Sequence, residues 1–424
     1  MESFSLLKFL KDNSYLNQSR YDNLRYELDK RLYYYGNHFK YPHEINDTQY
    51  KTQLFSYLIY LVTLYKISQT QKSEIKGEVI VSNSYFTVND ELKKLGYKVF
   101  DPSWQISRDG NVLSNFEIFF KGEKIKSSLK NSNFRELIKE DFINEITQYE
   151  DVLKKLFQHK KVKSIFVPND LGFFENLSIQ ICKQISIPSF IFLHGLPAIY
   201  NQIDNHRSDY LIVWGEKIKE NYVKSGMNAN KIFVSGHPYY KQQKLTQLKF
   251  SLDNILVLTK SLNGVHYSDG AILGDRSNLI LFLYSVEKSL RKFGVKSVRF
   301  RPHPCENGNW YLKYINNDFY KLDEDNLQQS IQKSSLVIGP TSTVFLESLY
   351  YGVDYVIYEP SLNNIDIANY PLVPPFDGSD SKIPVSKNED ELEYILKNKI
   401  RVDATCFNDY ITCPFDLNFI KKLI

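Results

Sequence analysis

The chain has 424 residues, of which 42% are hydrophobic and 24% are charged. This length and composition indicate a globular protein of two or three domains. The net charge of +4 is weak and dispersed along the chain. That argues against a nucleic-acid partner, because such an interface needs basic residues clustered on one face.

The cysteines and the N-terminus indicate a cytoplasmic protein. The cysteines form no CxxC pair, so neither a zinc site nor a disulfide framework is expected, and a reduced compartment fits best. The first residues, MESFSLLKFLKDNSY, lack the basic start and apolar core of a secretory signal. The apolar run 54–65 is too short to span a bilayer and is predicted to be a buried helix. The basic run 159–163 is predicted to be a solvated helix end, which could touch the inner membrane peripherally.

Residues 1–245 are predicted to form a first α/β domain on the acceptor side, with residues 1–75 as a helical lead-in. After Gly77, short apolar runs alternate with helical segments, which is typical of a parallel sheet covered on both faces. The expected strands lie at 78–82, 97–100, 164–167, 189–193, 210–214 and 231–238, and a helix is expected at 176–184.

A second α/β domain is predicted over residues 246–400, after the polar stretch 240–249. Its expected strands are 255–259, 298–300, 336–338 and 355–358, with helices at 277–293 and 344–351. The tail, 401–424, is predicted to pack back on the first domain. Two Rossmann-like, doubly wound domains in tandem place a ligand crevice between them, at the carboxyl ends of their strands.

The strongest local motif is Arg299-Phe300-Arg301-Pro302-His303-Pro304, directly after a strand. Arg301 and His303 are predicted to enter the crevice, where both can donate hydrogen bonds to a phosphate. The prolines, Pro304 included, stiffen the backbone around the imidazole, so that little entropy is lost on binding. The alternative is a turn whose prolines merely end the strand.

A second motif, Gly339-Pro340-Thr341-Ser342-Thr343, follows the strand at 336–338 and precedes a helix. Its hydroxyl groups and free backbone amides would form an anion site at the helix N-terminus. Ser342 or Thr343 could instead act as an N-cap, which is compatible with binding phosphate. Glu347, about one turn into the helix, could accept hydrogen bonds from ribose hydroxyls or could be a solvated carboxylate.

Together, these motifs resemble the donor half of bacterial GT-B glycosyltransferases that use CMP-sugars: sialyltransferases, polysialyltransferases and Kdo transferases with a His-Pro motif and a downstream Ser/Thr motif. The resemblance covers roughly residues 251–360. It implies that His303 contacts the CMP phosphate and acts as electrostatic catalyst or general acid. It further implies that Gly339, Thr341, Ser342 and Thr343 surround the same phosphate, and that Glu347 contacts the ribose.

No cofactor and no metal ion are expected. CMP carries a single phosphate, which a histidine, hydroxyl groups and a helix dipole can neutralise. The DxD-like triplet Asp323-Glu324-Asp325 is predicted to be a surface loop or helix start.

The acidic candidates of the first half are Asp170 and Glu175, in a segment that follows the strand at 164–167 and leads into a helix. The sialyltransferases carry an acidic-acidic-Gly motif in a comparable place, whose base deprotonates the acceptor hydroxyl. The match is imperfect, because Asn169-Asp170 replaces two acids and Leu171 precedes Gly172. Either carboxylate is a candidate base, and either could simply cap the helix.

Asp269 is a different kind of candidate. It lies in a loop after the first strand of the second domain, and the resemblance to retaining β-Kdo transferases implies a nucleophile in this region. An Asp-Gly turn is the alternative. His194 is a candidate contact to the acceptor or the donor carboxylate, Arg276 is available to pair with an acidic sugar, and His237 is expected to be a hinge element.

The function expected from the sequence is transfer of an acidic ulosonic sugar from a CMP donor to a hydroxyl of a surface glycan. Kdo is the first choice and sialic acid the second, and the acceptor would be a glycan or lipid-linked glycan of lipopolysaccharide, O-antigen or capsule. Two other readings stay open: a CDP-glycerol-type polyol-phosphate transferase, and a non-catalytic module that binds nucleotide sugars.

Overall fold

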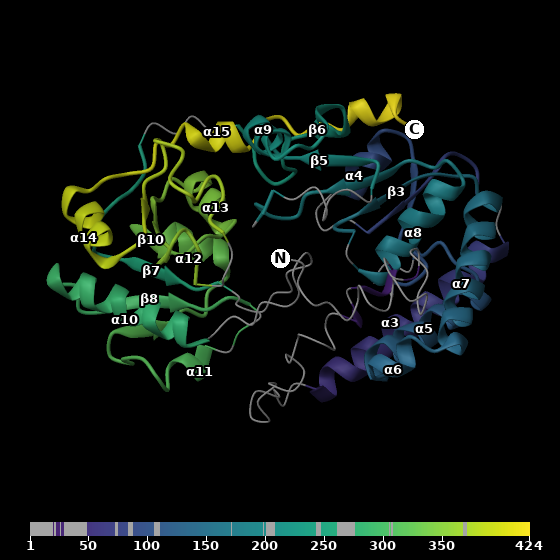
Figure 1. Ribbon diagram of the computed structural model, residues 1–424, viewed down its shortest axis with the longest axis horizontal. Helices are drawn as coiled ribbons and strands as arrows, with labels where there is room; N and C mark the ends of the chain where they lie inside the picture. The colour runs from purple at the N-terminus through teal and green to yellow at the C-terminus, as the bar shows by residue number, and fades with distance from the viewer. Residues whose placement is uncertain are drawn as a thin grey trace, which may run out of the picture.

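The computed structural model describes residues 20, 23–25, 27–28, 49–72, 75–83, 88–105, 111–170, 172–197, 199–200, 208–242, 247–260, 276–304, 306, 308–367 and 371–424. Two lobes face each other, and each is built around a six-stranded parallel sheet (Figure 1). The prediction of two Rossmann-like α/β domains is therefore confirmed, and the arrangement is GT-B-like.

The first sheet has the strand order β2-β1-β3-β4-β5-β6, with every neighbouring pair parallel. Its central strands are apolar and almost wholly buried, as both faces are covered by helices. The strands are β1 (Val79–Ser82), β2 (Lys98–Phe100), β3 (Val162–Val167), β4 (Ser189–Phe192), β5 (Tyr210–Val213) and β6 (Ile232–Val234). The helices are α3 (Gln49–Lys72), α4 (Val88–Lys94), α5 (Phe116–Asn131), α6 (Phe134–Leu137), α7 (Glu140–His159), α8 (Phe173–Gln184), α9 (Glu216–Lys224) and η3 (Ala229–Lys231).

The second sheet has the order β12-β11-β10-β7-β8-β9 and is also parallel throughout its described strands. Its strands are β7 (Ile255–Leu258), β8 (Val298–Arg301), β9 (Tyr320–Leu322), β10 (Leu336–Gly339), β11 (Tyr355–Tyr358) and β12 (Val385–Ser386). The helices are α10 (Arg276–Lys292), α11 (Gly308–Tyr311), α12 (Leu327–Lys333), α13 (Val344–Tyr350), α14 (Glu389–Asn398), α15 (Cys406–Tyr410) and η4 (Asn418–Lys422).

The strand orders identify where ligands are expected. In each sheet the chain first adds strands on one side and then crosses over to add strands on the other. The change of side occurs between β1 and β3 in the first domain and between β7 and β10 in the second. Connections leave to opposite faces at such a switch point and open a crevice at the carboxyl ends of the two strands. The segments that follow these four strands are therefore the places to look for functional side chains.

The C-terminal tail lies over the first domain (Figure 1). The Thr412 amide donates to the Trp214 carbonyl at 2.8 Å, and the Asp416 amide donates to the Ser235 carbonyl at 2.8 Å. The Phe419 ring stacks on Phe233, with 4.9 Å between centroids. The tail therefore lies over the carboxyl ends of β5 and β6, and its helix α15 contacts both α9 of the first domain and α13 of the second.

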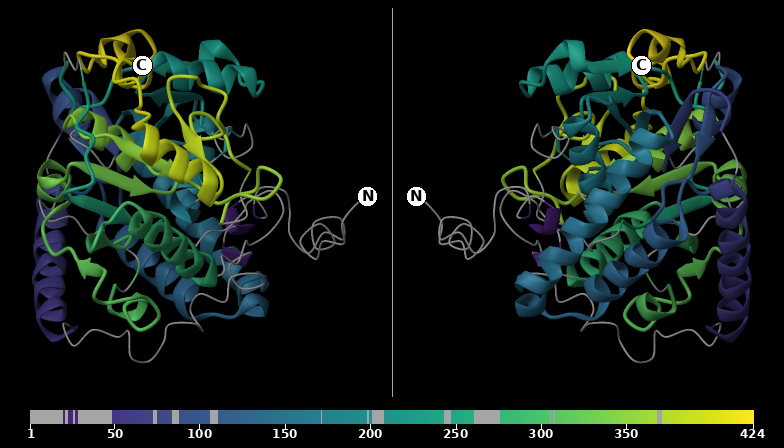
Figure 2. Two further views of the ribbon diagram at one scale, coloured as in Figure 1. Left: turned by 90° about the vertical axis from the view of Figure 1, so that its left-hand side faces the viewer. Right: turned by 90° about the vertical axis from the view of Figure 1, so that its right-hand side faces the viewer.

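The helix predicted over residues 54–65 is present, but the prediction that it is buried is wrong. The segment belongs to α3, whose side chains Tyr57, Leu58, Leu61, Val62 and Tyr65 are all exposed. Figure 2 shows α3 along the outer edge of the molecule, where it packs on α5. Within the described residues, no helix combines the length and apolar character needed to cross a bilayer.

Candidate functional site

The switch point of the second sheet holds a buried cation. Lys260 follows the end of β7, and its Nζ lies 3.1 Å from Thr341 Oγ1, 3.0 Å from Glu359 Oε2 and 2.5 Å from Asp366 Oδ2. The Lys260 side chain is 11% exposed and that of Glu359 is 0% exposed. Because two carboxylates share this one ammonium group, Lys260 contributes no surplus positive charge to a ligand.

The loop between β10 and α13 carries the three predicted hydroxyl side chains into this region. The Thr341 amide donates to Glu359 Oε2 at 2.8 Å, and the Val344 amide donates to Ser342 Oγ at 3.2 Å. Thr341 Oγ1 accepts a hydrogen bond from Lys260, so the proton of the Thr341 hydroxyl group is directed to a different acceptor. The amides of Ser342 and Thr343 donate to no acceptor within the described part of the chain, so two backbone donors remain for an anion.

Thr343 joins the two domains. Its Oγ1 accepts a hydrogen bond from the Leu196 amide of the first domain at 3.0 Å. Gly195 lies against the same hydroxyl, since a Cβ atom at Gly195 would be 3.2 Å from Thr343 Oγ1. Thr343 precedes the first residue of α13 but makes no side-chain cap hydrogen bond. Its hydroxyl is thus used for the interdomain contact rather than as an N-cap.

Gly339 is required by close packing rather than by an unusual backbone angle. The Tyr355 hydroxyl lies directly over its Cα and donates to the Pro340 carbonyl at 2.7 Å. Any Cβ at this position would overlap that hydroxyl. Gly339 therefore lets Tyr355 hold the start of the loop, and it shapes the site without offering a side chain to a ligand.

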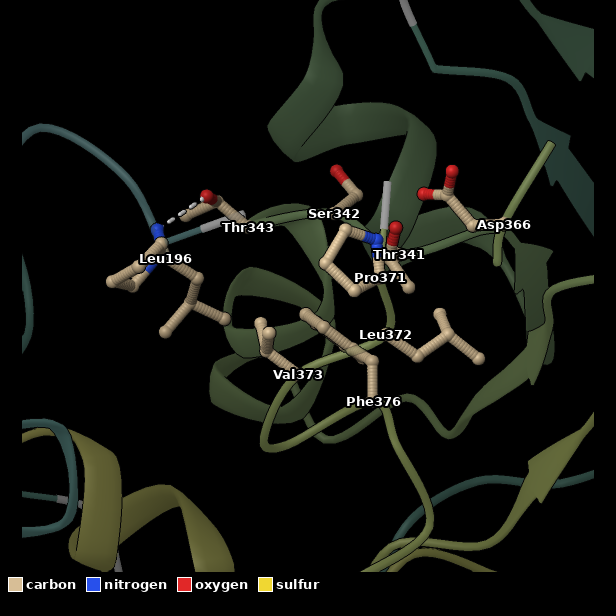
Figure 3. A pocket seen from close by; sticks show the side chains of 10 residues that line it. Leu196, Thr341, Ser342, Thr343, Asp366, Pro371, Leu372, Val373 and Phe376 are labelled. Carbon is tan, nitrogen blue, oxygen red and sulfur yellow. Dashed lines mark hydrogen bonds between the residues drawn. The ribbon is translucent and has the colours of Figure 1, made fainter. Parts of the chain in front are cut away.

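A small pocket lies where this loop meets the first domain (Figure 3). Its polar lining consists of Thr341, Ser342, Thr343 and Asp366. Its apolar lining consists of Leu196, Pro197, Pro371, Leu372, Val373 and Phe376. Because both domains contribute lining residues, the pocket lies between the two domains.

His303 lies at the same edge of the sheet, after β8. Its amide donates to Thr259 Oγ1 at 3.2 Å, next to Lys260, and its carbonyl accepts from the Glu306 amide at 2.8 Å. The imidazole is half-buried, and burial lowers its pKa. Strands β8 and β10 flank β7, so the loops bearing His303 and Ser342 start about 10 Å apart. His303 does not line the pocket.

Arg301 is turned away from this loop. Side chains alternate along a strand, so Arg299 and Arg301 share one face of β8. Both guanidinium groups approach the buried Asp323 carboxylate, at 2.8 Å and 3.6 Å respectively. Arg301 also donates to the Asp325 carbonyl and to Ser330 Oγ. Asp323 is thus the anchor of an arginine pair, and the structure does not bring the Arg301 guanidinium to the predicted phosphate site.

Glu347 and Pro304 lie apart from the pocket lining. Glu347 is in the first turn of α13, and burial raises its pKa. Burial raises the pKa of Tyr240 and Tyr351, and the nearby Glu347 carboxylate raises it further. Glu347 therefore faces the linker between the domains, while Pro304 is exposed on the turn after His303.

The switch point of the first sheet holds Glu175. Its Oε1 accepts from Asn83 Nδ2 at 3.1 Å, and Asn83 follows β1. Burial raises the pKa of Glu175, while hydrogen bonds, among them the one from Asn83, lower it. A carboxyl with a raised pKa at a strand-end crevice suits a general base. The structure thus brings Glu175 to the edge of the sheet that faces the second domain.

Asp170 occupies a different environment from Glu175. Its side chain is 0% exposed, and its carbonyl accepts from Asn176 Nδ2 at 3.3 Å. A carboxylate sealed in this way cannot approach an acceptor without a rearrangement of the β3–α8 connection. Of the two predicted acids, only Glu175 is therefore placed for chemistry in this conformation.

His194 is exposed at the end of β4, two residues before the Leu196 amide that contacts Thr343. Its Nδ1 lies 3.0 Å from the Pro168 carbonyl. A carbonyl oxygen can only accept, so the proton of the neutral ring is on Nδ1, and Nε2 is an acceptor. This tautomer suits contact with a hydroxyl proton of a substrate.

The other His-Pro motif, His237-Pro238, packs against aromatic side chains. His237 is 3% exposed, and its ring packs 4.7 Å from Trp214 and 4.4 Å from Tyr240. Burial lowers its pKa to about 3, so the ring is neutral at physiological pH. Asp269 lies outside the described residues, as does the side chain of Arg276, which begins α10. Among the described side chains, no group of three His, Cys, Asp or Glu residues could hold a metal ion.

Three residues of the site were not predicted from the sequence: Lys260, Glu359 and Asp366. Lys260 and Glu359 lie just after β7 and β11, whereas Asp366 lies further along the segment that follows β11. Lys260 ends the β7 run, and Glu359 ends the β11 run. A charged residue at the end of a buried parallel strand was the available signal, because these ends converge at one edge of the sheet.

Comparison with known proteins gives fold likeness only. No family model matches the chain, and no curated protein matches it. A UDP-GlcNAc 2-epimerase from Neisseria meningitidis bound to UDP-GlcNAc is similar at 11% identity and a TM-score of 0.45, over 82% of this chain and 98% of that one. A glycosyltransferase from Rickettsia africae is similar at 11% identity and a TM-score of 0.46, over 82% and 97%.

A third similar structure is a lipopolysaccharide outer core galactosyltransferase in its apo form. It shares 9% identity and a TM-score of 0.44, over 82% of this chain and 98% of that one. These neighbours are nucleotide-sugar enzymes, and at such identities the likeness concerns the fold.

Proposed function

We propose that the protein transfers an acidic ulosonic sugar from a CMP donor to a hydroxyl group of a bacterial surface glycan. Kdo is the preferred sugar, with sialic acid second. The observation that supports this most is the position of the Thr341–Thr343 loop. It is at the switch point of the second sheet, beside the His303 loop and against the first domain.

The donor phosphate would be held without a metal ion. The amides of Ser342 and Thr343 and the Ser342 hydroxyl donate to its oxygen atoms. His303 approaches from the far side of β7 and stabilises the charge that develops on the leaving CMP.

The bond changes follow from this placement. The bond between the anomeric carbon and the phosphate oxygen breaks, and its electron pair leaves with CMP. A bond forms between the same carbon and the acceptor oxygen, whose proton passes to the Glu175 carboxylate. His194, with Nε2 as acceptor, orients the acceptor hydroxyl or a hydroxyl of the donor sugar. Asp269 stays a candidate nucleophile for a two-step, retaining version of this reaction.

Titration with CMP, CDP and UDP, each with and without Mg²⁺, tests the donor class. We expect CMP to bind most tightly and Mg²⁺ to leave its affinity unchanged, as measured by calorimetry. Hydrolysis of CMP-Kdo and CMP-sialate should then be detectable as released CMP. Tighter binding of CDP, with hydrolysis of CDP-glycerol, would contradict the proposal. CMP binding without turnover of any donor would instead indicate a binding module.

A further inference from the structure

The charged groups around the pocket are concentrated at one end. Asp366 is the only charged side chain among its described lining residues, and it is 8% exposed. Lys260 lies behind it and is shared with Glu359, so the cluster holds one ammonium and two carboxyl groups. The Asp366 end of the pocket is therefore acidic, and it attracts hydrogen-bond donors and disfavours phosphate or carboxylate groups.

The rest of the lining suits a flat, uncharged ring. Phe376 is 4% exposed and is fixed by an edge contact with Phe345, with 5.7 Å between centroids. Figure 3 shows Phe376 and Val373 below the Thr341–Thr343 loop, with Leu196 on one side and Asp366 on the other. Pockets that are mostly apolar with a few placed polar groups fix both the position and the orientation of a ligand.

We propose that this pocket takes the pyrimidine base of the donor nucleotide, and that Asp366 selects cytosine over uracil. This inference rests on the proposed function, and it adds the residue that sets the base preference. Cytosine presents an exocyclic amine, which donates to a carboxylate, whereas uracil presents a carbonyl oxygen at the same position. Two acceptors that face each other form no hydrogen bond, so the uracil oxygen would be buried without a donor.

The phosphate location agrees with this orientation. Thr343 lies at the Leu196 end of the pocket, and Asp366 lies at the other end (Figure 3). A nucleotide placed in this way keeps its anionic group away from Asp366 and Glu359. The base, which is neutral, occupies the acidic end.

Binding of CMP and UMP to the wild type and to Asp366→Asn provides the test. We expect the wild type to prefer CMP by about tenfold or more, as a bidentate or charged base contact typically gives. Asp366→Asn should lose this preference, because its amide can also donate to the uracil oxygen. Asp366→Ser serves as a second variant if the first does not fold, with folding checked by circular dichroism.

Glu359→Gln is the matched control, since Glu359 also contacts Lys260 Nζ but does not line the pocket. It should weaken CMP and UMP binding equally and keep their ratio. Equal binding of CMP and UMP by the wild type, or the same loss of preference in Glu359→Gln, would overturn the role of Asp366 while leaving CMP as the donor nucleotide. Binding of neither nucleotide would refute the proposed function as well.

Discussion

Replacing His303 with alanine is expected to lower the rate of sugar transfer by about 10²–10³-fold, the typical cost of one preorganised donor in a transition state. The fold should persist, because the contacts that hold this turn are made by backbone atoms: the His303 amide to Thr259 and the His303 carbonyl to Glu306. Release of CMP from the donor under single-turnover conditions measures the effect.

The same variant has a pH signature. Burial lowers the pKa of His303, so the ring is neutral in the free protein near pH 7. A bound phosphate favours the protonated ring, so that CMP binding takes up a proton and strengthens as the pH falls. His303→Ala should abolish this dependence. His159→Ala, at the exposed end of α7, is the control and should behave as wild type. An unchanged transfer rate in His303→Ala would refute the role assigned to the imidazole.

The second large effect is expected for Glu175→Gln. Removal of a general base costs about 10²–10⁴-fold in rate, whereas CMP affinity should stay the same because Glu175 belongs to the other domain. The wild-type rate should rise with pH through the pKa of Glu175, which burial raises, since only the deprotonated form acts as a base. This rising limb should disappear in the variant.

Glu216→Gln is the matched control, because Glu216 is also in the first turn of a helix that follows a strand but is exposed. It should change neither the rate nor its pH dependence. If Glu175→Gln transfers sugar at the wild-type rate while a variant of His194 does not, the base is His194. The assignment to Glu175 would then be wrong, although the donor site would be unaffected.

Much of the fold could be predicted because parallel strands buried on both faces are continuous apolar runs. Residues 336–338 and 355–358 are examples, and both are strands in the structure. The edge strands β9 and β12 were not predicted, because they have three and two residues and little apolar character. The exposure of α3 could not be predicted either, since an apolar run does not reveal how many neighbours will cover it.

Side-chain direction explains why part of the site could be predicted from the sequence and part could not. His303 and the Thr341–Thr343 loop follow strands of one sheet, so their common edge follows from topology alone. The orientation of Arg301 depends on Asp323, a buried partner on the β9–α12 connection that nothing in the Arg-Pro-His-Pro motif indicates. Lys260 follows β7, whereas Glu359 and Asp366 both follow β11, and only the assembled sheet brings these groups together.

A crystal structure of the protein with CMP tests the central claim most directly. We predict that one phosphate group accepts hydrogen bonds from both the His303 imidazole and the Ser342 hydroxyl, with the base between Phe376 and the Thr341–Thr343 loop. A nucleotide bound elsewhere, or a phosphate that touches neither residue, would contradict the account of the donor site.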